Sequence, residues 1–380
     1  MHGGKKYWKH LFEEIVASEI CCSCSACVVA CPHKVLELHD FDPIMVDLES
    51  PLDDCLHGQK GCSLCAAACP RLEPTVDLIE EVMHGHRRDQ DQVEGSHLFK
   101  ALARARDPNI LELGQDGGAV TAMIAWGLDT GELDGAVVAA PSETTPWLDE
   151  PRVVTNKQQL LAAAGSRYTY CATPLALERV AAKGLNAIAI VGVSCESTAV
   201  RQLQAAKIKR WVRPIKLVFG LMCCETFDYD SYMVGKIQQE RGIPLTEVTK
   251  VNIKGRVIVT LRDGTDVTIP LKESRPQANP WCHHCPDFAA EHADLSFGGL
   301  GMEGWTMVLV RSEHGRDYLE RAIASGVLET RDPFHEQRAL DLLVRLAAKQ
   351  RARVAPDDPH ALAAYASNQA LEAARRRLGT

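Results

Sequence analysis

The sequence predicts an α/β protein in which a small cysteine-rich module precedes a larger mixed α/β domain and a helical C-terminal tail. Three observations support this prediction. Cysteines gather in two runs near the N-terminus, short apolar runs alternate with amphipathic stretches through the middle of the chain, and the segment from His335 onward has only helical periodicity. Alternating apolar strands and amphipathic helices are typical of domains in which helices cover a sheet.

The composition is that of a globular protein. With 380 residues, the chain is long enough to bury a sizeable core and to form about two or three domains. Its net charge of −8 argues against nucleic acid as the main partner. No apolar stretch reaches the roughly 18 residues that a membrane span needs, and the N-terminus lacks the apolar core of a signal peptide. We therefore expect a cytoplasmic location, which is compatible with a place at the periphery of a membrane complex.

The fifteen cysteines are the strongest feature of the composition. An odd number in a long chain without a signal peptide favours metal ligation over a disulfide framework. Two runs have the patterns C-x2-C-x2-C-x3-C-P and C-x6-C-x2-C-x3-C-P. The first run consists of Cys21, Cys24, Cys27 and Cys31, and the second of Cys55, Cys62, Cys65 and Cys69.

This spacing is that of bacterial ferredoxins, in which three thiolates of a run bind one [4Fe–4S] cluster and the fourth reaches the other cluster. Paired zinc sites or scattered core thiols are the alternatives, but zinc prefers separate C-x2-C pairs. Cys22 falls outside the pattern and is interpreted as a spare thiol. The sequence therefore predicts one cluster on Cys21, Cys24, Cys27 and Cys69, and another on Cys55, Cys62, Cys65 and Cys31.

The pattern of the chain also predicts its division into domains. Short strands are expected at residues 35–38 and 44–48, and the charged stretch 80–92 is interpreted as a helix end and a linker. The resulting units are a ferredoxin-like module over residues 1–90, a catalytic domain over 91–334 and a helical tail over 335–380.

Strand and helix patterns alternate in the second domain. This alternation predicts a mostly parallel sheet, and the sequence Arg262-Asp263-Gly264-Thr265 marks a hairpin in an antiparallel insertion. Buried strands are expected at residues 135–140, 186–193 and 216–221, and helices at 118–130, 174–183 and 197–206.

Two glycine-rich turns have the composition of a phosphate or flavin site. Residues 114–118 read Gly-Gln-Asp-Gly-Gly and open a predicted helix, and residues 165–168 read Gly-Ser-Arg-Tyr. Glycine lets backbone N–H groups approach a ligand, a helix N-terminus favours negative charge, and arginine pairs well with phosphate. A plain N-capped turn and an ordinary surface loop are the competing interpretations.

Four further cysteines are placed to meet at the edge of the sheet. Cys195 and Cys223 each follow a predicted strand, and Cys282 and Cys285 form a C-x2-C pair. The C-terminal ends of parallel strands lie along one edge, where binding sites usually form. We expect a third [4Fe–4S] cluster on these thiols, with a zinc site or a structural C-x2-C pair as the alternatives.

Six ordered stretches of the second domain resemble the beta-subunit family of coenzyme F420-dependent hydrogenases and dehydrogenases. Together they cover about residues 98–330, and six ordered blocks are far more specific than any one of them. The N-terminal cysteine runs make the chain most similar to members with additional clusters, such as F420H2 dehydrogenase input subunits. The blocks lie at residues 114–122, 165–168, 191–200, 220–227, 282–294 and 301–308.

The resemblance implies FAD next to a [4Fe–4S] cluster on Cys195, Cys223, Cys282 and Cys285. Coenzyme F420 is then the cosubstrate that exchanges a hydride with FAD. Single electrons pass through three [4Fe–4S] clusters to or from a ferredoxin or a partner redox subunit of a hydrogenase, a formate dehydrogenase or a respiratory complex. No side chain is expected to be catalytic, since the flavin carries the chemistry.

The cofactor-binding residues that the resemblance implies lie in the two glycine turns and in a later Gly-Trp pair. Trp305 is expected to shape the deazaflavin pocket, with a core aromatic as the alternative. Arg167, Lys272 and Arg275 are candidates for contact with the acidic tail of the deazaflavin. The full set is Gly114, Gln115, Asp116, Gly117, Gly118, Thr121, Gly165, Ser166, Arg167, Tyr168, Gly304 and Trp305.

Two departures from the family pattern leave the hydride partner open. Residues 193–196 read Val-Ser-Cys-Glu where the family pattern is closer to Thr-Pro-Cys-Gln, and residues 171–173 read Cys-Ala-Thr in place of a Ser-Pro stretch. One alternative function is a ferredoxin-dependent flavin and iron–sulfur reductase of an organic substrate, such as a tetrapyrrole side group. The other is a non-catalytic electron-transfer subunit.

Overall fold

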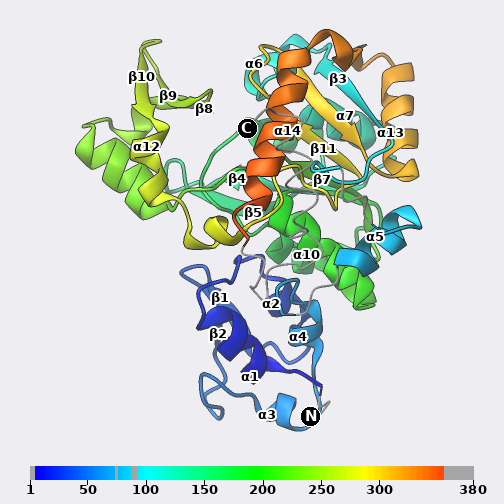
Figure 1. Ribbon diagram of the computed structural model, residues 1–380, viewed down its shortest axis with the longest axis vertical. Helices are drawn as coiled ribbons and strands as arrows, with labels where there is room; N and C mark the ends of the chain where they lie inside the picture. Colours follow the sequence, from blue (N-terminus) through cyan, green and yellow to red (C-terminus); the bar gives the residue numbers. More distant parts are fainter. Residues whose placement is uncertain (1–4, 73–75, 88–91, 355–380) are drawn as a thin grey trace.

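A large mixed sheet forms the centre of the protein. The computed structural model describes residues 5–72, 76–87 and 92–354, and its eight-stranded sheet has the order β13-β3-β12-β11-β7-β6-β4-β5 (Figure 1). The predicted mixed α/β class is therefore confirmed. The strands are β3 (Phe99–Ala105), β4 (Gly135–Pro141), β5 (Asp149–Val154), β6 (Ile188–Val193), β7 (Ile215–Leu221), β11 (Leu295–Gly298), β12 (Thr306–Val310) and β13 (Leu328–Arg331).

The sheet is parallel only at its centre. The pairs β4–β6, β6–β7 and β7–β11 are parallel, whereas β5, β12, β3 and β13 are joined by antiparallel pairs. The expectation of a mostly parallel sheet is therefore wrong. The apolar runs that suggested it are the central strands, which are buried on both faces, while β5 and β3 carry charged residues and lack that pattern.

Helices cover both faces of the sheet. Along β4, Ala136 and Val138 belong to one hydrophobic cluster, and the intervening Val137 belongs to another. This alternation builds a core on each side of the strands. The first face is covered by α6 (Pro108–Leu113), α7 (Ala119–Thr130), α8 (Lys157–Ala162) and α13 (Glu313–Ala324), and the second by α9 (Leu177–Ala182), α10 (Ser194–Ala205) and α11 (Lys209–Val212).

A small antiparallel sheet is inserted after β7, as the hairpin sequence predicts. It consists of β8 (Val248–Ile253), β9 (Arg256–Leu261) and β10 (Asp266–Pro270), in the order β10-β9-β8. Its inner side chains pack against the helical segment Tyr229–Glu240, and the short helix α12 (Leu271–Ser274) follows it. Figure 1 shows this unit standing beside the main sheet.

The cysteine-rich N-terminal module packs on the second face of the main sheet through α10 (Figure 1). Val29, Ala30 and Ala68 share one hydrophobic cluster with side chains of α10, and Gln202 of α10 donates to the carbonyl of Ala67 at 2.7 Å. The strand expected at residues 44–48 ends earlier than predicted. The elements are α1 (Trp8–Leu11), α2 (Ala26–Ala30), β1 (Leu36–His39), β2 (Asp42–Met45), α3 (Leu56–Gln59) and α4 (Leu64–Ala68).

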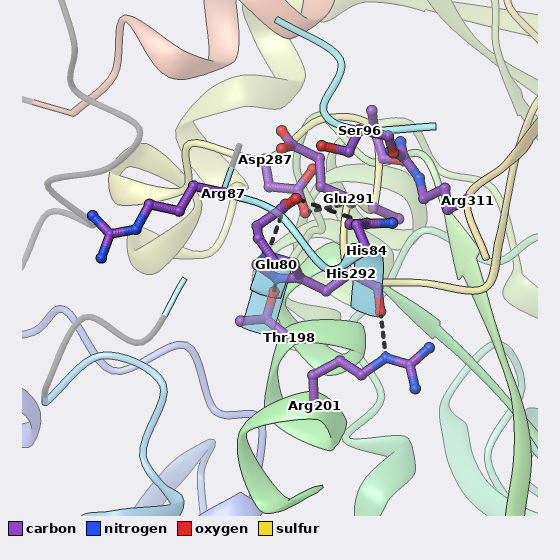
Figure 2. Close-up of polar contacts among 12 residues, drawn as sticks. Glu80, His84, Arg87, Ser96, Thr198, Arg201, Asp287, Glu291, His292 and Arg311 are labelled. Atoms are coloured by element: carbon purple, nitrogen blue, oxygen red, sulfur yellow. Dashed lines mark hydrogen bonds and ion pairs between the residues drawn. The ribbon is translucent and has the colours of Figure 1, made fainter. Parts of the chain in front are cut away.

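Helix α5 (Val76–His84) lies where the sequence predicts the start of a linker, and it is anchored by buried polar groups (Figure 2). Glu80 is fully buried, and its carboxylate oxygens lie 3.7 Å from Nε2 of His84 and 3.7 Å from Nε2 of His292. His292 Nδ1 in turn lies 2.9 Å from the hydroxyl of Thr198 on α10. The helix end expected in residues 80–92 lies at His84, but the burial of Glu80 was not expected, because charge alone does not distinguish an exposed segment from one whose charged side chains face buried partners.

The predicted amphipathic helix of the tail is α14 (Gln337–Arg351). Its apolar residues Ala339, Leu343 and Ala347 join the cluster that contains Leu102 of β3 and Met307 of β12. The rest of the predicted helical tail, residues 355–380, lies outside the described residues. Among the described residues, no helix has the length and apolar character needed to cross a membrane.

Candidate functional site

The cysteines of the two N-terminal runs line two separate cavities in the grouping that their spacing predicts. Each run supplies three cysteines to one cavity and its fourth to the other. The fourth cysteines are Cys31, which follows α2, and Cys69, which follows α4. The first cavity is lined by Cys21, Cys24, Cys27 and Cys69, and the second by Cys31, Cys55, Cys62 and Cys65.

The chemistry of these thiols fits a bound iron–sulfur cluster. Burial raises the pKa of Cys65 and the pKa of Cys69 to about 12 each. Such thiols stay protonated at neutral pH unless a metal ion binds the thiolate, as the irons of a cluster do. Across the three ranges that the structure describes, no three His, Cys, Asp or Glu side chains are arranged to hold a single metal ion.

The third group of cysteines lies where β6 and β7 end. These strands are parallel neighbours, so Cys195, in the first turn of α10, and Cys223, after β7, lie at the same edge of the sheet. Cys282 and Cys285 are electrostatic neighbours of Cys223, and Cys285 is also a neighbour of Cys195. The backbone N–H of Thr226 donates to Sγ of Cys282 at 3.5 Å. The structure thus brings the four predicted cysteines into one neighbourhood.

Cys22 and Arg71 lie between the first cavity and the third group of cysteines. Cys22, which the sequence left as a spare thiol, is 2% exposed and lines the first cavity. Hydrogen bonds to the thiols of Cys195 and Cys24 lower the pKa of Cys22. Arg71 lines the same cavity and donates from Nη1 to the carbonyl of His284 at 3.0 Å. The two cysteine regions are therefore in direct contact.

The end of α14 supports the third group, a role that sequence reasoning missed. Gln350 donates from Nε2 to the carbonyls of Cys223 and Cys224, at 3.3 and 3.2 Å. Arg353 donates from Nη1 to the carbonyls of Cys224 and Cys282, at 2.6 and 2.8 Å. The sequence feature that could have indicated this role is the basic end of the otherwise amphipathic helix α14.

The first glycine turn, at residues 114–118, is tightly packed against protein. A Cβ at Gly117 would lie 2.6 Å from the carbonyl oxygen of Ala103 and 2.9 Å from the backbone nitrogen of Thr306. Gly118 has a φ of +63° and is the N-cap of α7. Gln115 donates to the side chain of Asn252 on β8. Packing against neighbouring backbone thus explains part of the glycine pattern that suggested a phosphate site.

Asp116 and Tyr168 bring the two glycine turns together beside the third group of cysteines. Asp116 has a φ of +50°, and its carboxylate occupies the space where a side chain at Gly299 would lie. Burial raises the pKa of Tyr168, and the charges of Asp116 and Cys223 raise it further. The phenol is therefore an electrostatic neighbour of both. Parts of the two predicted cofactor turns converge near Cys223.

Arg167 is used by the fold. Its guanidinium pairs with Asp149 and donates to the carbonyls of Ala139 and Ala163, at 3.2 and 3.1 Å. Its side chain is only 11% exposed. These contacts tie β4 and β5 to the turn after α8, and they leave little of the guanidinium for a phosphate or an acidic tail. The two residues before it in the turn are more accessible to solvent, since Gly165 is exposed and Ser166 is half-buried.

Trp305 is buried between two cations. The guanidinium carbons of Arg331 and Arg104 lie 3.8 and 5.2 Å from the centre of its ring. It belongs to the hydrophobic cluster that includes α14, so the geometry favours the interpretation of Trp305 as a core aromatic. Gly304 has a φ of +68° and faces open space, and Thr121 is half-buried in the first turn of α7.

Two lysines near the first glycine turn were not predicted from the sequence. Lys250 on β8 and Lys254 in the turn after it are electrostatic neighbours of Asp116. Lys272 is exposed, and Arg275 lies 3.6 Å from the carboxylate of Glu225. The hairpin was predicted from its turn, but nothing in the local sequence shows that it stands over residues 114–118.

Comparisons with known proteins identify the family of this chain. The family described as coenzyme F420 hydrogenase/dehydrogenase beta subunit matches with its N-terminal part at residues 101–178 and with its C-terminal part at residues 185–336. The coenzyme F420 hydrogenase subunit beta of Methanothermobacter thermautotrophicus is 34% identical over 264 residues, which cover 68% of this chain and 93% of that protein. A component of the F420H2 dehydrogenase of Methanosarcina mazei is 27% identical over 316 residues, which cover 81% of this chain and 83% of that protein.

A solved structure agrees as well. A chain of the F420-reducing [NiFe] hydrogenase complex from Methanosarcina barkeri matches with a TM-score of 0.65 at 31% identity, over 68% of this chain and 90% of that one. Residues 1–100, which include the two N-terminal cysteine runs, precede the part matched by the family. The chain belongs to the coenzyme F420 hydrogenase/dehydrogenase beta-subunit family.

Proposed function

We propose that this protein is an iron–sulfur flavoprotein oxidoreductase that exchanges a hydride between coenzyme F420 and FAD and passes single electrons through three [4Fe–4S] clusters. Membership of the family supports the link to coenzyme F420. One observation carries the rest of the proposal. Tyr168 of the second glycine turn has Asp116 of the first turn and Cys223 as electrostatic neighbours, and the cysteine group of Cys223 adjoins the N-terminal module.

FAD, when bound, supplies the conversion between two-electron hydride chemistry and one-electron transfer. The residues of the chain bind, orient and exclude water. Tyr168 offers a half-buried aromatic ring near the junction of the two turns, with Asp116 as an electrostatic neighbour. We assign contact with the acidic tail of coenzyme F420 to Lys250 and Lys254, because both lysines are electrostatic neighbours of Asp116.

The cysteine groups form a series that leads away from the main sheet. The third group adjoins the first cavity through Cys22. The two cavities are linked in turn, because Cys31 of the first run lines the second cavity and Cys69 of the second run lines the first. The second cavity includes residues next to α3, which lies at the end of the molecule farthest from the sheet (Figure 1). Cys62 is half-exposed there. A ferredoxin or a partner redox subunit in the cytoplasm exchanges electrons at this end.

Anaerobic stopped-flow mixing with F420H2 tests the proposal. Wild-type protein reconstituted with FAD, iron and sulfide is expected to lose flavin absorbance first and cluster absorbance next. The variant Tyr168→Ala removes the ring at the junction and is expected to lose FAD or slow the flavin phase at least tenfold. Tyr168→Phe keeps the ring and serves as the matched control.

Two outcomes point elsewhere. If F420H2 leaves the flavin oxidised while reduced ferredoxin bleaches it, the protein is a ferredoxin-fed reductase of an organic substrate. If the protein takes up clusters but no FAD, it is an electron-transfer subunit without flavin chemistry. Either result would reject the proposed reaction without contradicting membership of the family.

A further inference from the structure

Arg71 is a buried cation without a carboxylate partner in the part of the chain that the structure describes. Its residue exposure is 6%, and no Asp or Glu oxygen in residues 5–72, 76–87 and 92–354 lies within ion-pair distance of it. A buried guanidinium is costly unless an anion and hydrogen-bond acceptors compensate its charge. Within the described residues, the thiols around Arg71 are the groups that can carry the compensating negative charge.

Sulfur atoms surround this side chain. It is hydrogen-bonded to Cys22 and has Cys285 and Cys195 as electrostatic neighbours, and it lines the cavity that holds Cys21, Cys24, Cys27 and Cys69. Its Nη1 donates to the carbonyl of His284 at 3.0 Å, between the two cysteines of the C-x2-C pair. One guanidinium thus borders two groups of predicted cluster ligands that belong to different parts of the chain.

We infer that Arg71 is the shared counter-charge of the two clusters on either side of it, and that it raises the reduction potential of both. This inference rests on the proposed function, because it requires clusters at both positions. A [4Fe–4S] cluster with four thiolates is anionic and gains one further negative charge on reduction. A fixed positive charge in a buried site stabilises the reduced form more than the oxidised form.

Arg71 lies between the two predicted clusters without being a ligand of either. It binds no cluster itself, so it is a positioning and tuning residue between two electron carriers. Its hydrogen bond to the carbonyl of His284 also fixes the N-terminal module against the loop of the C-x2-C pair. A shift of both potentials in the same direction leaves the difference between the two clusters largely unchanged, so the charge tunes the pair as a unit. The second cavity, lined by Cys55 and Cys62, does not include Arg71.

Redox titration of each cluster, followed by electron paramagnetic resonance, tests the inference. In Arg71→Gln, which keeps a hydrogen-bond donor but removes the charge, the potentials of the two adjacent clusters are expected to fall together. The cluster at Cys31, Cys55, Cys62 and Cys65 should keep its potential and act as an internal reference. Arg71→Lys keeps the charge and should stay close to wild type. Arg71→Met is a second neutral variant, for the case in which the glutamine variant folds poorly.

Lys60→Met is the matched control. Lys60 lies two residues before Cys62, as Arg71 lies two residues after Cys69, but its side chain is exposed, so solvent screens its charge. Unchanged potentials in Arg71→Gln and Arg71→Met, or equal shifts in Arg71→Lys, would overturn the inference. Iron and sulfide analysis of the wild type keeps the two failures separate, because a wild type without three clusters would contradict the proposed function, whereas unchanged potentials in variants that hold all three clusters would contradict the role of Arg71 alone.

Discussion

Thr173 donates two hydrogen bonds to the same carboxylate oxygen of Glu196, from its backbone N–H at 2.6 Å and from its hydroxyl at 2.8 Å. The other oxygen of Glu196 accepts from the backbone N–H of Val193 at 2.8 Å. Glu196 follows Cys195 and is 3% exposed. Residues 171–173 and 193–196 are the two segments in which this chain departs from the pattern that it otherwise resembles. The two segments are in contact, because Thr173 of the first donates its hydrogen bonds to the carboxylate of Glu196 in the second.

This contact predicts that substitutions of Glu196 and Thr173 lower the free energy of unfolding by different amounts. Glu196→Ala leaves the N–H groups of Thr173 and Val193 without their acceptor in a buried site, and should lower the free energy of unfolding by about 3 kcal/mol. Thr173→Val removes one hydroxyl donor and should cost about 1 kcal/mol. Urea unfolding midpoints, read from tryptophan fluorescence, measure both changes. Equal costs would show that the carboxylate is not the centre of this network.

The sequence predicted what short-range pattern determines. The spacing of the cysteine runs grouped Cys31 with the second run and Cys69 with the first, and the structure places them in those cavities. The hairpin turn at residues 262–265 was likewise predicted, because its Asp-Gly pair is a local turn signal. Arg71 and Arg353 escaped because their partners, His284 and Cys224, come from distant segments and the contacts are made to backbone carbonyls. A carbonyl acceptor leaves no signature in the sequence of either partner.

Iron content distinguishes Cys22 from its neighbour Cys24. Both are buried and line the first cavity, but only Cys24 fits the spacing of a ligand. In reconstituted protein, Cys24→Ser is expected to lose about four irons, or one cluster, and Cys22→Ser is expected to keep all of them. Iron and sulfide assays give the answer directly. Loss of a cluster in Cys22→Ser would make this thiol a ligand and would require a different grouping of the cysteines.

Arg353 is expected to hold the third group of cysteines in place. Its guanidinium donates to the carbonyls of Cys224 and Cys282, so Arg353→Met frees the loops on which Cys223 and Cys282 lie. The variant should take up about one cluster fewer than wild type, or lose that cluster faster on exposure to a chelator. Arg345→Met, at an exposed position of α14 before the turn that carries Arg353, is the matched control and should behave as wild type. Equal chelator sensitivity in the two variants would remove α14 from the account of the site.

His84 makes the stability of the protein sensitive to acid. Burial, with the positive charges of Arg311 and Arg201 among its neighbours, lowers the pKa of His84 to about 4, although Asp294 opposes the shift. An unfolded histidine has a pKa of about 6.5, so between about pH 6.5 and 4 the unfolded state binds more protons than the folded state. The contribution of His84 to stability is therefore complete above about pH 6.5 and is lost as the pH falls toward 4.

The loss at the acidic end is on the order of 2 kcal/mol for this residue. His84→Gln cannot take up the proton and should show a shallower fall in the free energy of unfolding between pH 7 and pH 5, measured by urea unfolding of the same preparation. His39→Gln, at a side chain that is 70% exposed, provides the control and should keep the wild-type slope. An unchanged slope in His84→Gln would mean that the network around Glu80 and His292 already accommodates a protonated imidazole in the folded state.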